Sequence, residues 1–209
     1  KNQLGTFYPA ERVVLVRSLL ETQPSERLID AMGEFGKIAL IDGGAWVRKL
    51  ERTNLQGSDL LWAFLKQAIE SKMKVVAKDP FEKSGVRQIL NLGHTLGHAL
   101  EAHYGSSHGA AVAQGLFFAI EYGEIEGYLP EKEAQRAVHL LTQKLNLLPL
   151  RPSKLIAAKT LKQLILQDKK RSRSGEVTFI FLRGMGRTVR QATRVDDVVR
   201  EAKRQGWVK

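Results

Sequence analysis

The sequence predicts a mainly α-helical bundle that carries one small β-hairpin near its C-terminus. Apolar residues recur at helical spacing through most of residues 24–147, which is typical of helices that bury one face. Near the C-terminus the pattern changes to two β-rich runs, residues 177–182 and 187–193, joined by a glycine-bearing loop. At 209 residues the chain is long enough to bury a core, and no repeat or low-complexity tract divides it. We therefore expect one helical domain.

The first half of the chain is expected to form three helices. The first, over residues 25–42, begins at a serine that can cap it and ends before two glycines. Apolar residues at helical spacing predict two more helices over residues 45–50 and 58–73. Residues 74–76 read as a short extended link, because a proline at position 80 restricts the residue that precedes it.

The second half is expected to add three longer helices before the hairpin. The first covers residues 87–104 and contains a cluster of histidines, and the second covers residues 108–128. The third covers residues 131–147, and Pro130 opens it. A last short helix begins at Asp196, after the hairpin.

Composition limits the functions that the chain can have. The formal net charge is +11, but the densest basic cluster, residues 169–173, has no interleaved aromatics for base stacking, so we expect no nucleic-acid partner. The sequence has no apolar run long enough for a membrane helix and no signal-peptide pattern at its start, so we expect a cytoplasmic protein without a membrane partner. Because there is no cysteine, histidine and carboxylate side chains must hold any metal.

The histidine cluster indicates a site for a metal ion and for proton transfer. His94 and His98 stand four residues apart, so on a helix both imidazoles project from one face. They could be two ligands, or one ligand and one acid/base group. Gly93 and Gly97 weaken a helix by roughly 1 kcal/mol each relative to alanine, so helix stability does not account for this segment. His108 follows as a third candidate, and no glutamate follows His94 as a zinc-protease motif requires.

A catalytic metal usually has three protein ligands, and Glu34 is the candidate for the third. It lies three residues before Lys37, so an exposed ion pair on a helix surface is the alternative interpretation. Cations elsewhere in the sequence could form the rim of an anion pocket, namely Lys72, Arg87, Lys169 and Lys170. Arg87 is expected two turns before His94 on the same helix.

At these residues the chain resembles the 3-dehydroquinate synthase family. The most specific segment is residues 91–98, Asn-Leu-Gly-His-Thr-Leu-Gly-His, and the resemblance is collinear along the whole chain. Further matching segments are Lys1-Asn2, Glu34 with Lys37, Lys72 with Asp79, Gly85-Val86-Arg87, His108-Gly109 and Asp168-Lys169-Lys170. The resemblance implies the C-terminal helical domain of a two-domain enzyme, covering residues 1–209, whose N-terminal NAD-binding α/β domain this chain does not contain.

The resemblance also implies a role for individual residues. Glu34, His94 and His108 correspond to ligands of a divalent zinc or cobalt ion, and His98 and Glu82 to catalytic acid/base groups. The positions that bind substrate in the family correspond to Asn2, Lys37, Lys72, Arg87, Asn91, Lys169 and Lys170. The side that contacts NAD corresponds to Lys1, Asp30 and the segment from Leu19 to Thr22.

The implied activity is a lyase reaction of the shikimate pathway, which leads to chorismate and the aromatic amino acids. It converts 3-deoxy-D-arabino-heptulosonate 7-phosphate, a small anionic sugar phosphate, to 3-dehydroquinate and phosphate with NAD and a metal ion. The full-length enzyme is then expected to be a homodimer, and this chain alone is expected to be inactive. Two alternatives remain: another sugar-phosphate cyclase of the same superfamily, or a non-catalytic basic helical module that binds a partner.

Overall fold

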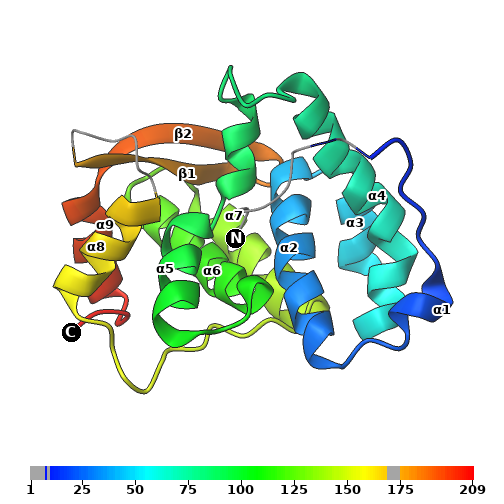
Figure 1. The fold of residues 1–209 in the computed structure, drawn as a ribbon, viewed down its shortest axis with the longest axis horizontal. Helices are drawn as coiled ribbons and strands as arrows, with labels where there is room; N and C mark the ends of the chain where they lie inside the picture. Colours follow the sequence, from blue (N-terminus) through cyan, green and yellow to red (C-terminus); the bar gives the residue numbers. More distant parts are fainter. Residues whose placement is uncertain (1–7, 9, 169–174) are drawn as a thin grey trace.

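The computed structural model describes residue 8 and residues 10–168 and 175–209, and it confirms a mainly helical architecture with one C-terminal hairpin (Figure 1). Its elements are, in order, α1 (Arg17–Leu20), α2 (Glu26–Asp42), α3 (Ala45–Arg52), α4 (Gly57–Lys78), the 3-10 helix η1 (Val86–Asn91), α5 (His94–Tyr104), α6 (His108–Ile125), α7 (Glu131–His139), the π-helical turn η2 (Leu140–Lys144), α8 (Ala158–Asp168), β1 (Glu176–Gly184), β2 (Arg187–Arg194) and α9 (Val195–Arg204).

Helices α2 and α6 form the centre of the bundle. Leu40 of α2 and Val112, Leu116 and Phe118 of α6 are all 0% exposed. Burying side chains of this size contributes roughly 1.5–3 kcal/mol each. Helix α4 packs against α2, α5 packs against α6, and α8 contacts both α5 and α9 (Figure 1). The two central helices therefore pack against each other and against the helices on either side, α4 and α5.

The hairpin closes one edge of this bundle. β1 and β2 form an antiparallel hairpin, as the sequence predicts, and the structure pairs Val177 with Thr193 and Phe181 with Val189. The ring of Phe181 lies 5.1 Å from that of Tyr122 on α6, an edge-to-face contact that joins the sheet to the central helix. Most of β1 is buried, whereas most of β2 is at least partly exposed.

Two expected elements differ from the structure. Residues 74–76 are helical, because α4 continues to Lys78 and the residue restricted by the proline is Asp79, which ends the helix with φ −150° and ψ 63°. The expected helix over residues 87–104 is interrupted at Gly93, whose φ of 77° is left-handed and cannot continue an α-helix. The result is η1 followed by α5, so Arg87 and His94 are not on one helix.

Other boundaries follow the expectations more closely. Helix α2 ends at a left-handed Gly43, as predicted, but the side chain of Ser25 makes no capping hydrogen bond at its start. Helix α6 ends three residues earlier than expected, at Ile125, and residues 131–147 divide into α7 and η2. In the part of the chain that the structure describes, no helix has the length and apolar character needed to cross a bilayer.

Candidate metal centre

Close packing of helix backbones brings Glu34, His94 and His108 together. A Cβ added at Gly33 would lie 2.0 Å from the carbonyl oxygen of Gly109, so α2 and α6 touch at this pair of glycines. Glu34 and His108 are the direct neighbours of these two glycines. A Cβ at Gly115 would lie 1.8 Å from the carbonyl oxygen of Gly93, so the turn before His94 is held just as closely to α6. Because glycine has no side chain at these contacts, the helix backbones lie close enough to bring Glu34, His94 and His108 near one another.

Glu34 forms an ion pair with Lys37 inside the bundle, which corrects the alternative of an exposed helical pair. The Lys37 ammonium donates to both carboxylate oxygens of Glu34 at 2.8 Å. Lys37 is only 2% exposed. Burial would raise the pKa of Glu34, but the charge and hydrogen bond of Lys37, with smaller contributions from His94 and Lys72, lower it overall. Glu34 is therefore a carboxylate at neutral pH.

His94 opens helix α5 with its Nε2 atom available as an acceptor. Its Nδ1 lies 3.2 Å from the carbonyl oxygen of Leu92. Because a carbonyl only accepts, Nδ1 carries the proton and Nε2 keeps its lone pair. Burial, followed by the positive charge of Lys37, lowers the pKa of His94 to about 3. This imidazole is neutral at physiological pH, as a metal ligand must be.

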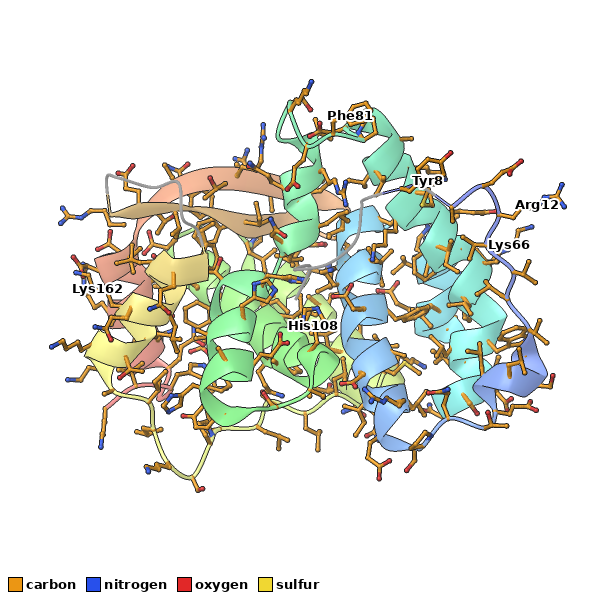
Figure 2. The ribbon with its side chains drawn as sticks, in the orientation of Figure 1. Tyr8, Arg12, Lys66, Phe81, His108 and Lys162 are labelled. Atoms are coloured by element: carbon orange, nitrogen blue, oxygen red, sulfur yellow. The ribbon has the colours of Figure 1, made fainter. Side chains whose placement is uncertain are left out.

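His108 opens helix α6 and is oriented by a carboxylate. Its Nδ1 donates to Oε2 of Glu101 on α5 at 2.8 Å. Because a carboxylate accepts, this contact places a proton on Nδ1, and in the neutral ring Nε2 is then the acceptor. Nε2 lies 3.6 Å from Oε1 of Glu34. Figure 2 shows His108 near the middle of the molecule, between α6 and α2.

These atoms are spaced as the ligands of one metal ion would be. Oε1 of Glu34 lies 3.6 Å from Nε2 of His94 and 3.6 Å from Nε2 of His108. Ligand atoms about 2.1 Å from a tetrahedral zinc ion are roughly 3.4 Å apart, close to these separations. The Lys37 ammonium also approaches His94 Nε2 at 3.5 Å, so a cation already faces Glu34 and His94. The donor set therefore fits a small divalent cation.

His98 belongs to the same cluster. Its ring centroid lies 4.8 Å from that of His94 and 5.7 Å from that of His108. One nitrogen from each of the three histidines can be chosen so that all lie within 4.8 Å of one another. The geometry accommodates His98 either as a ligand or as a neighbouring acid/base group, so the two possibilities left open by the sequence both remain.

Lys72 contacts this centre, and the other candidate substrate and acid/base residues that lie outside it in the described chain belong to the segment that follows α4. The ammonium of Lys72 on α4 is 3.7 Å from Oε2 of Glu34, and about half of its side chain is exposed. Arg87 and Asn91 lie at the two ends of η1, and the guanidinium of Arg87 donates to the carbonyl oxygen of Pro80 at 3.3 Å. Glu82 is exposed and has a left-handed backbone with φ 55°. Among the described residues no hydrogen bond or ion pair joins the Glu82 carboxylate to the histidines, and Figure 2 shows neighbouring Phe81 at the outer edge of the molecule.

A buried aspartate organises the loop that carries Glu82 and Arg87. The carboxylate of Asp79 accepts backbone N–H bonds from Lys83 at 2.8 Å, Ser84 at 3.2 Å and Arg87 at 3.2 Å. Burial would raise the pKa of Asp79, but these donors outweigh it and hold the pKa below its usual value. The loop therefore depends on an ionised Asp79.

The residues expected on the NAD side lie around the start of the described chain. Leu19 is exposed on α1, and the Thr22 hydroxyl donates to the carbonyl oxygen of Leu19 at 3.0 Å. Asp30 on α2 has one oxygen near Arg27 at 3.4 Å and a second, Oδ1, that is buried without a hydrogen-bond donor among the described residues. The remaining expected site residues, Lys1, Asn2, Lys169 and Lys170, lie outside the described residues.

Two partners of the histidines were not expected from the sequence. They are the carboxylate of Glu101 and the carbonyl oxygen of Leu92. Glu101 follows His98 by three residues, so its place on the same face of α5 was the signal that could have identified it. The bond to Leu92 arises from the turn at Gly93, and the pattern of a continuous helix gave no sign of that turn.

A family model described as 3-dehydroquinate synthase C-terminal matches residues 31–171. The chain belongs to the 3-dehydroquinate synthase family. Among its curated relatives, the 3-dehydroquinate synthase of Pseudoalteromonas atlantica is 34% identical over 196 residues, which cover 90% of this chain and 54% of that protein. The 3-dehydroquinate synthase of Bacillus pumilus is 34% identical over 209 residues, which cover 95% of this chain and 55% of the relative. The chain thus spans about half the length of these synthases.

The fold is also that of a solved sugar-phosphate cyclase. A 2-deoxy-scyllo-inosose synthase, crystallised with carbaglucose-6-phosphate, NAD+ and Co2+, superimposes with a TM-score of 0.79 at 24% identity. The match covers 99% of this chain and 59% of the other. At this identity the likeness establishes the fold that the dehydroquinate synthase family shares with this cyclase.

Proposed function

We propose that this chain is the C-terminal, metal- and substrate-binding half of a two-domain 3-dehydroquinate synthase. The full-length lyase converts 3-deoxy-D-arabino-heptulosonate 7-phosphate to 3-dehydroquinate and inorganic phosphate. The observation that carries the proposal is the convergence of a carboxylate and two imidazoles, with Glu34 Oε1 at 3.6 Å from both His94 Nε2 and His108 Nε2. Membership in the family, with synthases 34% identical over most of this chain, supports the choice of reaction.

We assign the metal to Glu34, His94 and His108, and proton transfer to His98. The neutral state of His94 supports the assignment. It is also supported by the carbonyl oxygen of Leu92 and the carboxylate of Glu101, which each accept a hydrogen bond from Nδ1 of one of the two histidines. When bound, a divalent zinc or cobalt ion supplies a Lewis acid for substrate oxygens, and NAD supplies the hydride acceptor and donor. His98 stands beside His94, and an imidazole there can donate or accept a proton.

The cations at the edge of the cluster suit an anionic sugar phosphate. Lys72 offers a half-exposed ammonium close to Glu34, and Arg87 offers a planar guanidinium near the start of η1. The remaining proposed substrate and acid/base positions are Asn2, Lys37, Glu82, Asn91, Lys169 and Lys170. Asp30, with a buried oxygen that has no donor among the described residues, is the strongest of the NAD-side positions, beside Lys1, Leu19 and Thr22.

The test is turnover by the full-length protein. With NAD and Zn2+ or Co2+, it is expected to release phosphate from the heptulosonate phosphate and to form 3-dehydroquinate. His94→Ala and chelation of the metal are each expected to abolish turnover, whereas His139→Ala, an exposed histidine on α7, serves as the matched control. A full-length protein that folds, binds metal and leaves the heptulosonate phosphate unchanged would refute the proposed reaction.

The second candidate is another sugar-phosphate cyclase, which the likeness to 2-deoxy-scyllo-inosose synthase favours. Such an enzyme acts on a phosphorylated sugar without the carboxylate of the heptulosonate. The same assay with sedoheptulose 7-phosphate and glucose 6-phosphate separates the candidates. Release of phosphate from either sugar, and not from the heptulosonate, would transfer the assignment to the second candidate.

A further inference from the structure

The indole N–H of Trp46 on α3 reaches two other helices. Its Nε1 donates to Oδ2 of Asp42, the last residue of α2, at 2.7 Å and to Oγ of Ser71 on α4 at 3.1 Å. Ser71 is buried, so its hydroxyl is shielded from competing water, and a bond to a carboxylate is stronger than one between neutral groups. Figure 1 shows these three helices grouped on one side of the molecule. One N–H therefore ties α3 to the end of α2 and to α4.

The ring of the same tryptophan packs against one aromatic side chain from α2 and one from α4. The ring centroid of Trp46 lies 5.6 Å from that of Phe35 in an edge-to-face contact and 6.4 Å from that of Phe64. These ring contacts set the spacing of α2 and α4. The hydrogen bond to Ser71 is directional, so it also restrains the rotation of α4 about its own axis.

Two partners of Trp46 are direct neighbours in the sequence of residues at the candidate metal centre. Phe35 follows Glu34 on α2, and Ser71 precedes Lys72 on α4. The Lys72 ammonium lies 3.7 Å from Oε2 of Glu34, and about half of the lysine side chain is exposed. An ion pair with an exposed lysine gains little and loses side-chain entropy, so the pair alone does not fix this geometry. The backbones on which the two charged residues stand must be held by other contacts, and Trp46 supplies them at the adjacent positions.

We propose that Trp46 is a positioning residue, which holds α2 and α4 so that the Lys72 ammonium stands beside Glu34 and faces the substrate anion. The inference rests on the proposed function, in which Lys72 binds the sugar phosphate. Trp46 acts through Lys72 and is assigned no contact with the substrate. The effect is expected to be large for a residue outside the site, because a displacement of about 1 Å at a binding group can cost up to about 100-fold in rate.

Carbodiimide cross-linking of the full-length protein, after chelation of metal, measures the placement of α4 directly. The reagent joins an ammonium to an adjacent carboxylate as an amide, and mass spectrometry of a digest gives the yield of the Lys72–Glu34 product. Trp46→Phe keeps an aromatic ring but removes the N–H, and it is expected to lower this yield at least about threefold. The Lys66–Glu70 pair, 3.9 Å apart within α4, is the internal reference and should keep its yield, since a general loss of stability would change both products. An unchanged Lys72–Glu34 yield would overturn the proposal.

Steady-state kinetics of the full-length protein separate positioning from folding. Weaker substrate binding raises KM and leaves kcat, so Trp46→Phe is expected to raise the KM for the heptulosonate phosphate by about 5–20-fold with kcat within about twofold. Lys72→Ala is expected to raise KM further. The double variant should equal Lys72→Ala alone, because no ammonium is left to position. Effects of the two substitutions that multiply in the double variant would overturn the proposal.

Two further variants complete the test. Ser71→Ala removes one acceptor while alanine favours a helix, so it is expected to lower the cross-link yield and raise KM by about two- to fivefold without lowering the melting temperature. It replaces Trp46→Phe if that variant does not fold, and no change in either measurement would then overturn the proposal. Tyr104→Phe is the matched control, because it removes a ring donor that bonds the carbonyl oxygen of Lys154 at 2.7 Å, and it should keep both values. Cross-linking needs no turnover, so failure of the positioning and failure of the proposed reaction are separate results.

Discussion

Individual hydrogen bonds at the histidines decide what the candidate metal centre can bind. His94 and His108 each give their Nδ1 proton to an oxygen, from Leu92 in one case and Glu101 in the other. Both Nε2 lone pairs are thereby left for a cation, and neither ring needs to rotate or change tautomer. Glu101 differs from a carbonyl, because it also places a negative charge beside the ring that it orients.

Glu101→Gln is expected to weaken divalent-metal binding by roughly 10–100-fold, since an amide keeps the size of the side chain but removes its charge. The dissociation constant is measured by competition with a chromophoric chelator, with Co2+ absorption as a second readout of the geometry. Glu131→Gln is the control, because this exposed carboxylate on α7 accepts a hydrogen bond from Gln135 and has no ion pair among the described residues. Equal affinity of both variants and the unaltered protein would show that Glu101 does not position His108.

At the scale of elements, the periodicity of apolar residues predicted most helices and the hairpin, because these elements bury one continuous face. It missed the break at Gly93, since the apolar positions continue at helical spacing through η1 and α5 although the backbone turns. It assigned residues 74–76 as extended although the proline restricts only Asp79 and α4 continues to Lys78, and it gave no helix over α8. The sequence analysis predicted that Glu34, His94 and His108 are neighbours. It did not predict the glycine contacts between helices that bring them together, because the spacing of residues along the sequence does not show which helices pack against each other.

Gly109→Ala is expected to destabilise the protein and to weaken metal binding. The new Cβ would lie 2.0 Å from the carbonyl oxygen of Asp30, so α2 and α6 must separate. Overpacking of this kind costs about 1–3 kcal/mol, and separation of the helices moves Glu34 away from His108. Urea unfolding and metal titration measure the two effects.

Gly123→Ala is the control in the same helix, because its Cβ would meet only ordinary contacts from 3.6 Å outwards. This variant is expected to be neutral or slightly more stable, since alanine favours a helix. Equal effects of the two substitutions would contradict the role of the crossing.

The loop from Asp79 to Arg87 is expected to loosen in acid. The folded pKa of Asp79 is lowered, so its contribution to stability is full above the unfolded value of about 3.9 and is lost as the pH falls through the lower folded value. The amide resonances of Lys83, Ser84 and Arg87 are expected to shift together, with a midpoint below 3.9. Asp79→Asn should remove this common titration, and a midpoint at or above 3.9 would contradict the assigned hydrogen bonds.

At the scale of the whole molecule, the proposed metal ties together elements that are far apart in the sequence. Glu34 lies in the middle of α2, while His94 and His108 begin α5 and α6, so one ion would connect the middle of α2 to the starts of α5 and α6. In the described part of the chain the hydrogen bonds of the Lys37 ammonium go to Glu34 on α2 and His94 on α5, and none goes to α6. A bound divalent ion therefore adds a connection that the lysine does not provide.

This connection predicts that metal binding stabilises the 209-residue chain even though the chain alone is expected to have no synthase turnover. A metal present at 100 times its dissociation constant adds about 2.7 kcal/mol when it binds only the folded state. For a chain of this size, that corresponds to a rise in melting temperature of roughly 5–10 °C. The rise is measured by calorimetry with Zn2+ or Co2+ and should reverse with a chelator. His108→Ala should abolish it, whereas His139→Ala, an exposed histidine on α7, should retain it. If His108→Ala kept the full rise, the ion would be held elsewhere, and the convergence of α2, α5 and α6 would not be the metal centre.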